Sequence, residues 1–173
     1  PVFVKPNNGG SSLGISKVNT PEELAPALLK AFKEDTQVLV EEFISGREFT
    51  IGVFKSKGAT TVLPITEIIT ENEFFDFEAK YQGKSKEETP AQITDTMKAE
   101  LTAAATKAYA ILNCRGVVRI DFIYNEAQQK PYMLEVNTVP GQSDASVIPQ
   151  QLRAMGWSLT DFYGSIIEDT VSK

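Results

Sequence analysis

The chain has 173 residues, of which 42% are hydrophobic and 23% are charged, an ordinary composition for a globular protein. It contains no histidine and one cysteine, which excludes a Ser-His-Asp triad, a histidine-ligated zinc site, an internal disulfide and a cysteine metal cluster. The net charge of −6 argues against a nucleic-acid partner, and every apolar run is too short for a membrane span. Any acid, base or metal ligand must therefore come from Asp, Glu, Lys, Arg, Tyr or Ser.

The first quarter of the chain predicts a hairpin, a helix and a strand. Strands are expected at Val2–Lys5, Ile15–Val18 and Gln37–Phe43, with the loop PNNGGSSLG at Pro6–Gly14 and a helix from Thr20 to about Lys33. The start of the helix carries three signals, since Thr20 can cap, Pro21 suits the first helical position and Glu23 completes a capping box. Leu24, Leu28 and Phe32 supply its apolar face.

The middle of the chain predicts strands at Arg47–Lys55 and Thr60–Ile69, followed by an irregular segment from Glu71 to about Ala91. Long loops inside a compact domain are usually functional or disordered, and the aromatic residues of this segment argue against plain disorder. A helix follows from about Thr94 to Leu112. Its expected apolar side comprises Met97, Leu101, Ala105, Ala108 and Leu112.

The last third predicts a hairpin and two short helices. Strands are expected at Gly116–Tyr124 and Tyr132–Asn137, and helices at Pro149–Met155 and Thr160–Ser172, the last capped by Ser158 with Asp161. Hairpins and helices without a βαβαβ run predict an α+β fold with a largely antiparallel sheet. The break near Ser45-Gly46 predicts a small lobe at residues 1–45 and a larger one at 46–173.

The strongest chemical pattern is a pair of strands with polar residues two positions apart. Arg119 and Asp121 share one face of their strand, as do Glu135 and Asn137 of the next. If the turn at Asn125–Lys130 closes a hairpin, three oxygen ligands converge, which suits Mg²⁺, and the arginine can neutralise a developing anion. The alternative interpretation is a half-exposed hairpin with a salt bridge.

Three weaker patterns accompany it. Lys5 with its Gly-rich loop can cradle phosphates, or the loop is simply a hairpin tip. The segment from Val38 to Glu48 can form hydrogen bonds to a purine and a ribose, or it is a solvated acidic strand end. The pair Lys80-Tyr81 can belong to a flap that closes over phosphates, or to a surface loop pinned by aromatic residues.

Together these segments resemble the ATP-grasp core of the D-alanine–D-alanine ligases. The resemblance covers nearly the whole chain, and its motifs occur in the order of the family. They are VKPNNGGSSLGISKV, VLVEEFISGREFTIGV, FFDFEAKY, CRGVVRIDFIY and LEVNTVPGQSDASVIPQ. The resemblance implies two ATP-grasp lobes, ATP, and two Mg²⁺ ions with Mn²⁺ as a substitute.

The resemblance also implies a role for each matching residue. Those expected to contact the nucleotide are Lys5, Gly10, Ser12, Glu41, Glu42, Ile44, Glu48 and Lys80, with Glu48 on the ribose. The expected metal ligands are Asp121, Glu135 and Asn137. The expected catalytic groups are Arg119, Ser11, Tyr81 and the Gly141 backbone, and Ser146 with Val147 is expected to hold the carboxylate of the second D-alanine.

The implied activity is ATP-dependent formation of D-alanyl-D-alanine through an acyl phosphate, for peptidoglycan precursors in the cytoplasm. Alternatives are a D-alanine–D-lactate ligase or another ATP-grasp carboxylate–amine ligase, a non-catalytic nucleotide-binding module, and a metal-dependent hydrolase. Tyr81 is typical of dipeptide-forming enzymes in that family. The family usually dimerises, so we expect a homodimeric parent protein. The family also has an N-terminal domain, so we expect that this chain alone folds at least in its larger lobe but does not turn over.

Overall fold

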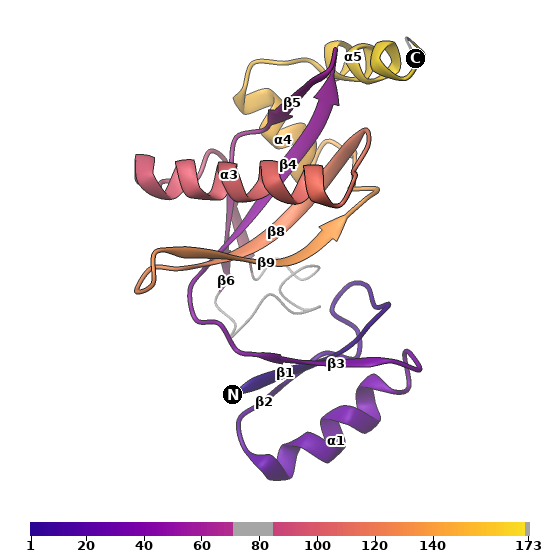
Figure 1. Cartoon of the computed structure of the whole chain (residues 1–173), viewed down its shortest axis with the longest axis vertical. Coiled ribbons are helices and arrows are strands. Elements are labelled where there is room, and N and C mark those ends of the chain that lie inside the picture. The colour runs from indigo at the N-terminus through magenta and orange to yellow at the C-terminus, as the bar shows by residue number, and fades with distance from the viewer. Residues whose placement is uncertain (71–84, 172–173) are drawn as a thin grey trace. The chain divides into compact units, whose positions relative to one another are not determined.

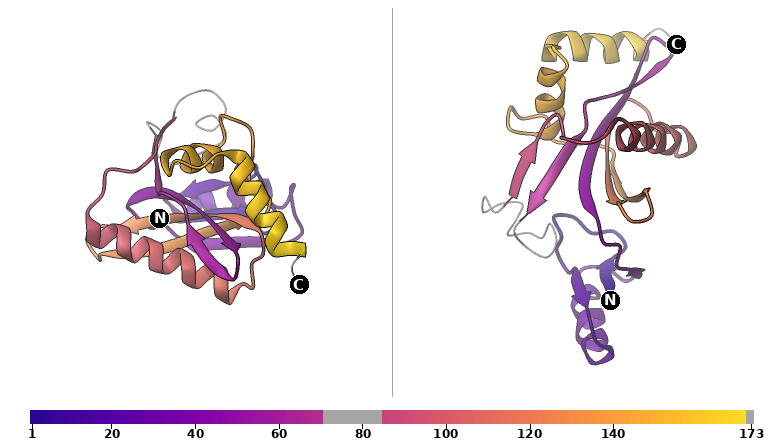
Figure 2. Two further views of the ribbon diagram at one scale, coloured as in Figure 1. Left: turned by 90° about the horizontal axis from the view of Figure 1, so that it is seen from above. Right: turned by 90° about the vertical axis from the view of Figure 1, so that its left-hand side faces the viewer.

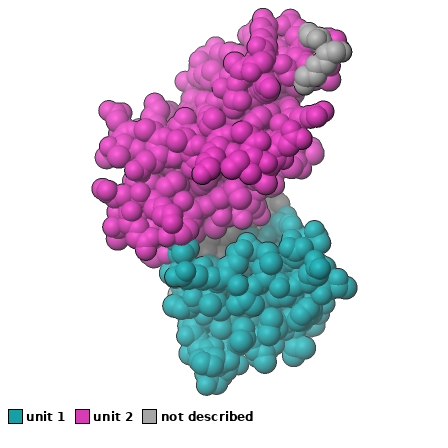
Figure 3. Space-filling model, viewed as in Figure 1, with its two compact units in different colours: residues 1–44, 70–86 teal, residues 45–69, 87–173 magenta. Residues whose placement is uncertain are grey.

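The computed structural model describes residues 1–70 and 85–171 (Figure 1). The chain separates into two compact units, which have different colours in Figure 3. Unit 1 comprises Pro1–Ile44 and Thr70–Lys86, and unit 2 comprises Ser45–Ile69 and Glu87–Lys173. None of the helices within the described ranges is long and apolar enough to cross a membrane.

Unit 1 is a small antiparallel sheet covered by one helix. Its elements are β1 (Val2–Pro6), β2 (Ser16–Val18), α1 (Pro21–Ala31) and β3 (Val38–Glu42). The strand order is β2-β1-β3, which confirms the predicted hairpin and places the third strand beside the first. The core between helix and sheet consists of Val4, Val18, Ala27 and Ala31.

Two details of α1 differ from the prediction. The side chain of Thr20 makes no capping bond, and Glu23 instead accepts from the Asn19 N–H, with 2.8 Å between nitrogen and Oε2. Phe32, expected on the apolar face, is 52% exposed because the helix ends at Ala31 and Phe32 is its C-cap.

Unit 2 is built on a larger sheet. Its elements are β4 (Arg47–Ser56), β5 (Ala59–Val62), β6 (Thr66–Thr70), β7 (Ser85–Glu88), α3 (Asp95–Ile111), β8 (Val117–Asn125), β9 (Lys130–Asn137), α4 (Val147–Ala154) and α5 (Leu159–Val171). The strand order is β7-β6-β4-β8-β9, with β5 also paired to β4. The pairings of β4 with β5, β6 and β8, and of β8 with β9, are antiparallel, as the sequence predicts.

The strand predicted at Thr60–Ile69 is wrong, because the chain forms two strands there. The break at residues 63–65 contains Pro64, which has no N–H for a sheet ladder. The N–H of Leu63 still reaches the Gly52 carbonyl at 2.8 Å, so both strands stay on the same side of β4. The segment predicted as irregular also ends in a strand, β7.

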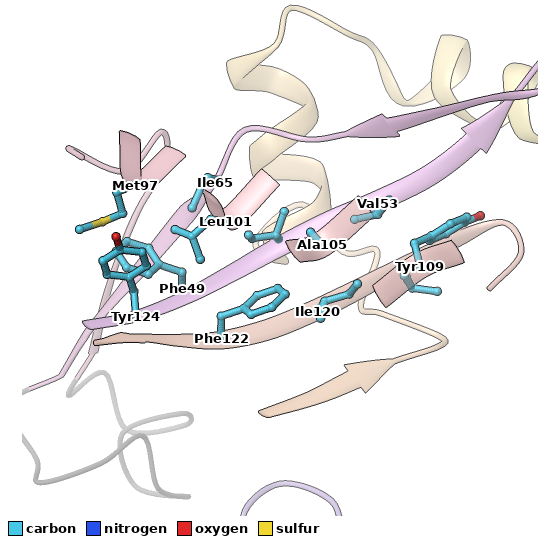
Figure 4. Close-up of a cluster of buried hydrophobic side chains, with 12 residues drawn as sticks. Phe49, Val53, Ile65, Met97, Leu101, Ala105, Tyr109, Ile120, Phe122 and Tyr124 are labelled. Atoms are coloured by element: carbon cyan, nitrogen blue, oxygen red, sulfur yellow. The ribbon is translucent and has the colours of Figure 1, made fainter. Parts of the chain in front are cut away.

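One face of the sheet packs on α3 and forms the main core (Figure 4). The helix contributes Met97, Leu101, Ala105 and Tyr109, and the strands contribute Phe49, Ile51, Val53, Val118, Ile120 and Phe122. Thr94 caps the helix, accepting from the Met97 N–H at 3.2 Å. Leu112 was expected on the apolar side but lies past the last helical residue and is 51% exposed.

The opposite face is covered by α4 and α5 only at the far end of β4 (Figure 2). A second core there contains Phe54, Ile148, Leu152 and Phe162. Gly52 permits this close packing, because a Cβ atom at that position would lie 2.6 Å from both Ile148 and Leu63. The same face also carries the polar side chains of Glu48, Thr50 and Asp121, with Ile68 and Ile123 beside Glu48.

Candidate functional site

Three neighbouring strands of unit 2 present polar residues on the face opposite α3. The antiparallel register places Thr50 beside Asp121, Asp121 beside Glu135, and Arg119 beside Asn137. The alternation therefore brings the two predicted pairs together across the hairpin. Glu48 lies two residues before Thr50 on β4 and so belongs to the same face.

A β-bulge adjoins the group. The register runs from Asp121↔Glu135 to Phe122↔Met133, which leaves Leu134 without a partner in the ladder. Bulges are common beside active sites because they re-aim a side chain. Here the irregularity directly precedes Glu135.

Asp121 is the centre of the polar group and is only 9% exposed. Its Oδ1 accepts from Thr50 Oγ1 at 2.5 Å and from Arg119 Nε at 3.0 Å. Its Oδ2 accepts from Arg119 Nη2 at 3.0 Å and from Asn137 Nδ2 at 3.1 Å. Four donors fix the carboxylate in one orientation.

The group suits a hard divalent cation. Asn137 Nδ2 lies 3.1 Å from Asp121 Oδ2 and 3.2 Å from Glu135 Oε1, so oxygens of both carboxylates surround one point. Rotating the Asn137 amide presents its oxygen there and completes an all-oxygen donor set, which Mg²⁺ prefers. Within residues 1–70 and 85–171, no three His, Cys, Asp or Glu residues cluster as a metal site, so the candidate set requires this amide.

A pocket of about 150 Å³ lies beside Arg119. It is lined by Glu87, Arg119, Pro140, Gly141, Ser146, Val147 and Ile148. Four of these, Arg119, Gly141, Ser146 and Val147, are sequence-predicted site residues. A Cβ atom at Gly141 would lie 2.7 Å from Ser146 Oγ, so a larger residue there would require the serine side chain to move.

Arg119 stays positively charged between these two sites. Burial lowers the pKa of its guanidinium, but the hydrogen bonds and charge of Asp121, with smaller contributions from Glu135 and Glu87, outweigh that effect and raise the pKa. The pocket therefore has one permanently cationic wall.

A buried amide links α4 to the strands, and sequence reasoning missed it. Gln151 is fully buried and its Nε2 donates to the Thr50 carbonyl at 2.9 Å and to Thr66 Oγ1 at 3.0 Å. Its Oε1 accepts from the Gly52 N–H at 3.0 Å. Polar Gln151 between apolar helix positions is the only local signal, because its partners lie about a hundred residues earlier in the chain.

In unit 1, Lys5 and Glu41 come together. Lys5 Nζ forms an ion pair with Glu41 Oε2 at 2.6 Å. Glu42 is exposed at the end of β3, and Ile44 is the last residue of the unit's first segment. Of the predicted nucleotide residues, Lys5 therefore lies on β1 and Glu41 and Glu42 lie on β3.

The Gly-rich loop has an unusual backbone. Ser11 and Ser12 both have positive φ, at 51° and 59°, a backbone conformation that residues other than glycine rarely adopt. Gly10 accepts from the Leu13 N–H at 3.0 Å, which closes a turn around the two serines. Consecutive strained residues of this kind are typical of functional loops.

The start of this loop is fixed by Asp35. The Asn8 N–H donates to Asp35 Oδ2 at 2.6 Å, and the Gln37 N–H donates to Oδ1 at 3.2 Å. These bonds, that of Asn8 being the stronger, lower the pKa of Asp35. The predicted flap residues Lys80 and Tyr81 lie outside the described residues.

Comparison with known proteins agrees with this geometry. The family described as "D-ala D-ala ligase C-terminus" matches residues 1–168. The D-alanine–D-alanine ligase of Flavobacterium johnsoniae is 49% identical over 97% of the chain, and that of Bacteroides fragilis is 46% identical over 98%. The alignments cover 51% and 52% of those proteins, so the chain spans about half the length of the curated relatives it matches.

Solved structures give the same result. The VanG D-Ala:D-Ser ligase of Enterococcus faecalis superposes with a TM-score of 0.86 at 36% identity, covering 96% of this chain and 48% of its own. The Bacillus anthracis D-alanine–D-alanine ligase complexed with ATP superposes with a TM-score of 0.81 at 31% identity. The match covers 99% of this chain and 53% of the ligase chain. The fold of the chain is the ATP-grasp fold.

Proposed function

The chain belongs to the D-alanine–D-alanine ligase C-terminal family, and we propose that it supplies the nucleotide, metal and acceptor sites of an ATP-dependent ligase that joins two D-alanines. The product, D-alanyl-D-alanine, is a peptidoglycan precursor. One observation carries the proposal: Arg119 lies between a carboxylate–amide group that suits Mg²⁺ and a pocket closed by Gly141 and Ser146.

The first step is phosphoryl transfer. A carboxylate is a poor acylating agent, so the carboxylate of the first D-alanine attacks the γ-phosphorus of ATP, giving an acyl phosphate and ADP. Asp121, Glu135 and Asn137 would hold Mg²⁺, which supplies charge neutralisation to the phosphates when bound. Lys5 would add a positive charge that binds phosphate oxygens.

The second step is acyl transfer. The amine of the second D-alanine attacks the acyl carbon, phosphate leaves, and the amide remains. Negative charge develops on the acyl oxygen, and Arg119 with the Gly141 N–H is suited to stabilise it. Ser146 and Val147, at the start of α4, would hold the acceptor's carboxylate, because a helix N-terminus presents free N–H groups to an anion.

The proposal extends to the remaining expectations from the sequence. Glu41, Glu42 and Ile44 would bind adenine, Glu48 the ribose, and Gly10, Ser11 and Ser12 the phosphates, while Lys80 and Tyr81 would close over them. A cytoplasmic homodimer is part of the same proposal, and light scattering on the whole protein tests the dimer.

The identity of the acceptor has a second candidate. The VanG relative is named a D-Ala:D-Ser ligase, and the chain is 36% identical to it. D-Serine and D-lactate therefore belong in the same assay as D-alanine. Preferential use of D-lactate would contradict the expectation from Tyr81.

Calorimetric titration of this chain with ATP and ADP tests the nucleotide site, with and without Mg²⁺. We expect metal-dependent binding that Asp121→Asn weakens and Glu168→Gln, an exposed change on α5, leaves unchanged. Binding that is equally strong without metal, or unaffected by Asp121→Asn, would reject the metal assignment. No nucleotide binding to the wild-type chain would reject the proposal that it contains a working nucleotide site.

A further inference from the structure

The pocket beside Arg119 contains a charged residue that the proposed mechanism does not use. Glu87, from β7, lines the cavity together with Arg119, Gly141 and Ser146. A volume of about 150 Å³ is room for roughly five water-sized groups, the size class of a small amino acid. Glu87 and Arg119 both line this space.

The two charges line the same pocket and influence each other. Glu87 is among the groups whose negative charge raises the pKa of Arg119 against the effect of burial. No direct hydrogen bond between the two carries this effect, since Arg119 bonds to Asp121. The pocket thus offers a positive and a negative site within one cavity.

Gln150 fixes the position of Glu87. Its Nε2 donates to Glu87 Oε2 at 2.5 Å and to the Ala145 carbonyl at 2.9 Å. The carboxylate is thereby held against the loop that leads into α4. An ionised carboxylate has about four acceptor sites on its two oxygens, so this bond leaves capacity for a ligand's donor.

The start of α4, which also lines the pocket, suits an anion. Ser146 is the N-cap of α4, and Val147 and Ile148, its first two residues, line the cavity and carry N–H groups that begin the helix. The helix dipole and Arg119 add positive potential. A pocket with this anionic site and with Glu87 is complementary to a zwitterion, whose carboxylate and ammonium are separated by one carbon.

We propose that Glu87 binds the ammonium group of the acceptor amino acid and thereby selects amine acceptors over hydroxy acids of the same shape. This inference rests on the proposed function, because it takes the pocket as the acceptor site. Gln150 is a positioning residue in this arrangement, acting through the carboxylate that it holds.

The test compares D-alanine with D-lactate, which has a hydroxyl in place of the ammonium. Both are titrated into the ¹⁵N-labelled chain, and their dissociation constants are read from amide shifts around Ser146 and Val147. We expect D-alanine to bind at least about tenfold more tightly, as a charge-assisted hydrogen bond predicts. Glu87→Gln keeps an oxygen for Gln150 but removes the charge, so the preference should fall to about one.

Glu88→Gln is the matched control. It removes the same charge from the next residue of β7, whose side chain points to the other face of the strand. The preference should remain. Gln150→Ala should reduce it partly, because the Glu87 carboxylate then loses its fixed orientation.

Three results would overturn the inference. They are equal affinity of the wild-type chain for the two acceptors, no binding of either, and a preference that survives Glu87→Gln. Titrating ADP and Mg²⁺ into the same samples separates this failure from that of the proposed function. Intact nucleotide binding with any of the three results rejects the role of Glu87 alone, whereas loss of nucleotide binding rejects the function.

Discussion

Thr50 donates a 2.5 Å hydrogen bond to Oδ1 of Asp121, the residue beside it on the neighbouring strand. Both residues are buried, with exposures of 3% and 9%. Groups that orient a metal ligand are often as important for affinity as the ligand itself. Thr50 is therefore suited to aim Asp121 at the cation.

Thr50→Val removes this bond without changing the shape of the side chain. We expect Mn²⁺ or Mg²⁺ affinity to fall about 10- to 100-fold, measured by calorimetry with ADP or by electron paramagnetic resonance of Mn²⁺. Thr50→Ser retains the hydroxyl and should restore most of the affinity. Thr60→Val, at an exposed position of β5, is the control, and equal affinity in Thr50→Val and Thr60→Val would contradict the role of Thr50.

Gln151→Leu tests the link between α4 and the strands. The change leaves the buried Gly52 N–H and Thr50 carbonyl without their partners, and we expect a loss of about 2 to 5 kcal/mol in the free energy of unfolding. Urea denaturation measures it. Gln92→Leu, at an exposed position, is the control and should change the free energy of unfolding by less than about 0.5 kcal/mol. An equally small change in Gln151→Leu would contradict the role of the buried amide.

Two glycines make a matched pair for alanine substitution. At Gly52 a Cβ atom would lie 2.6 Å from Ile148 and Leu63, so Gly52→Ala should destabilise unit 2 by about 1 to 3 kcal/mol. At Gly164, inside α5, a Cβ atom would meet nothing within 4 Å, and Gly164→Ala should stabilise by about 0.5 to 1 kcal/mol. Thermal denaturation compares them, and the same sign for both would contradict the packing described at β4.

Arg119→Ala tests the oxyanion role. The test uses a chimera in which the part of the Flavobacterium johnsoniae relative outside the alignment is joined to this chain. Turnover of that chimera should lose about 3 kcal/mol of transition-state stabilisation, as for other oxyanion donors. Arg115→Ala, exposed ahead of β8, is the control. An unchanged rate in the Arg119 variant would exclude the role.

The loop anchor at Asp35 should depend on pH. Hydrogen bonds from Asn8 and then Gln37 lower its pKa below the usual 3.8, so the charged form stabilises the folded state. This stabilisation is present above pH 3.8 and is lost as the pH falls through the lower folded value. The amide shift of Asn8, followed by NMR, should therefore change only below pH 3.8. An Asn8 transition at or above 3.8, or one that persists in Asp35→Asn, would contradict the anchor.

The sequence by itself determined the local architecture and most of the candidate site. Alternation along β8 and β9 placed Arg119 with Asp121 and Glu135 with Asn137, because side chains two apart on a strand share a face. The apolar side of the segment from Thr94 to Leu112 predicted α3, and the polar turn at Asn125–Lys130 predicted the last hairpin. The order of the motifs then identified the family.

Tertiary structure alone decided which distant groups support that site. Thr50 bonds to Asp121, 71 residues later, and Gln151 bonds to Gly52, 99 residues earlier. Sequence periodicity carries no information about contacts at such separations. Glu87 reached the pocket from a segment predicted as irregular, because pairing with neighbouring strands can outweigh weak local propensity. Local patterns decide which residues share a face, whereas packing between elements decides which faces meet.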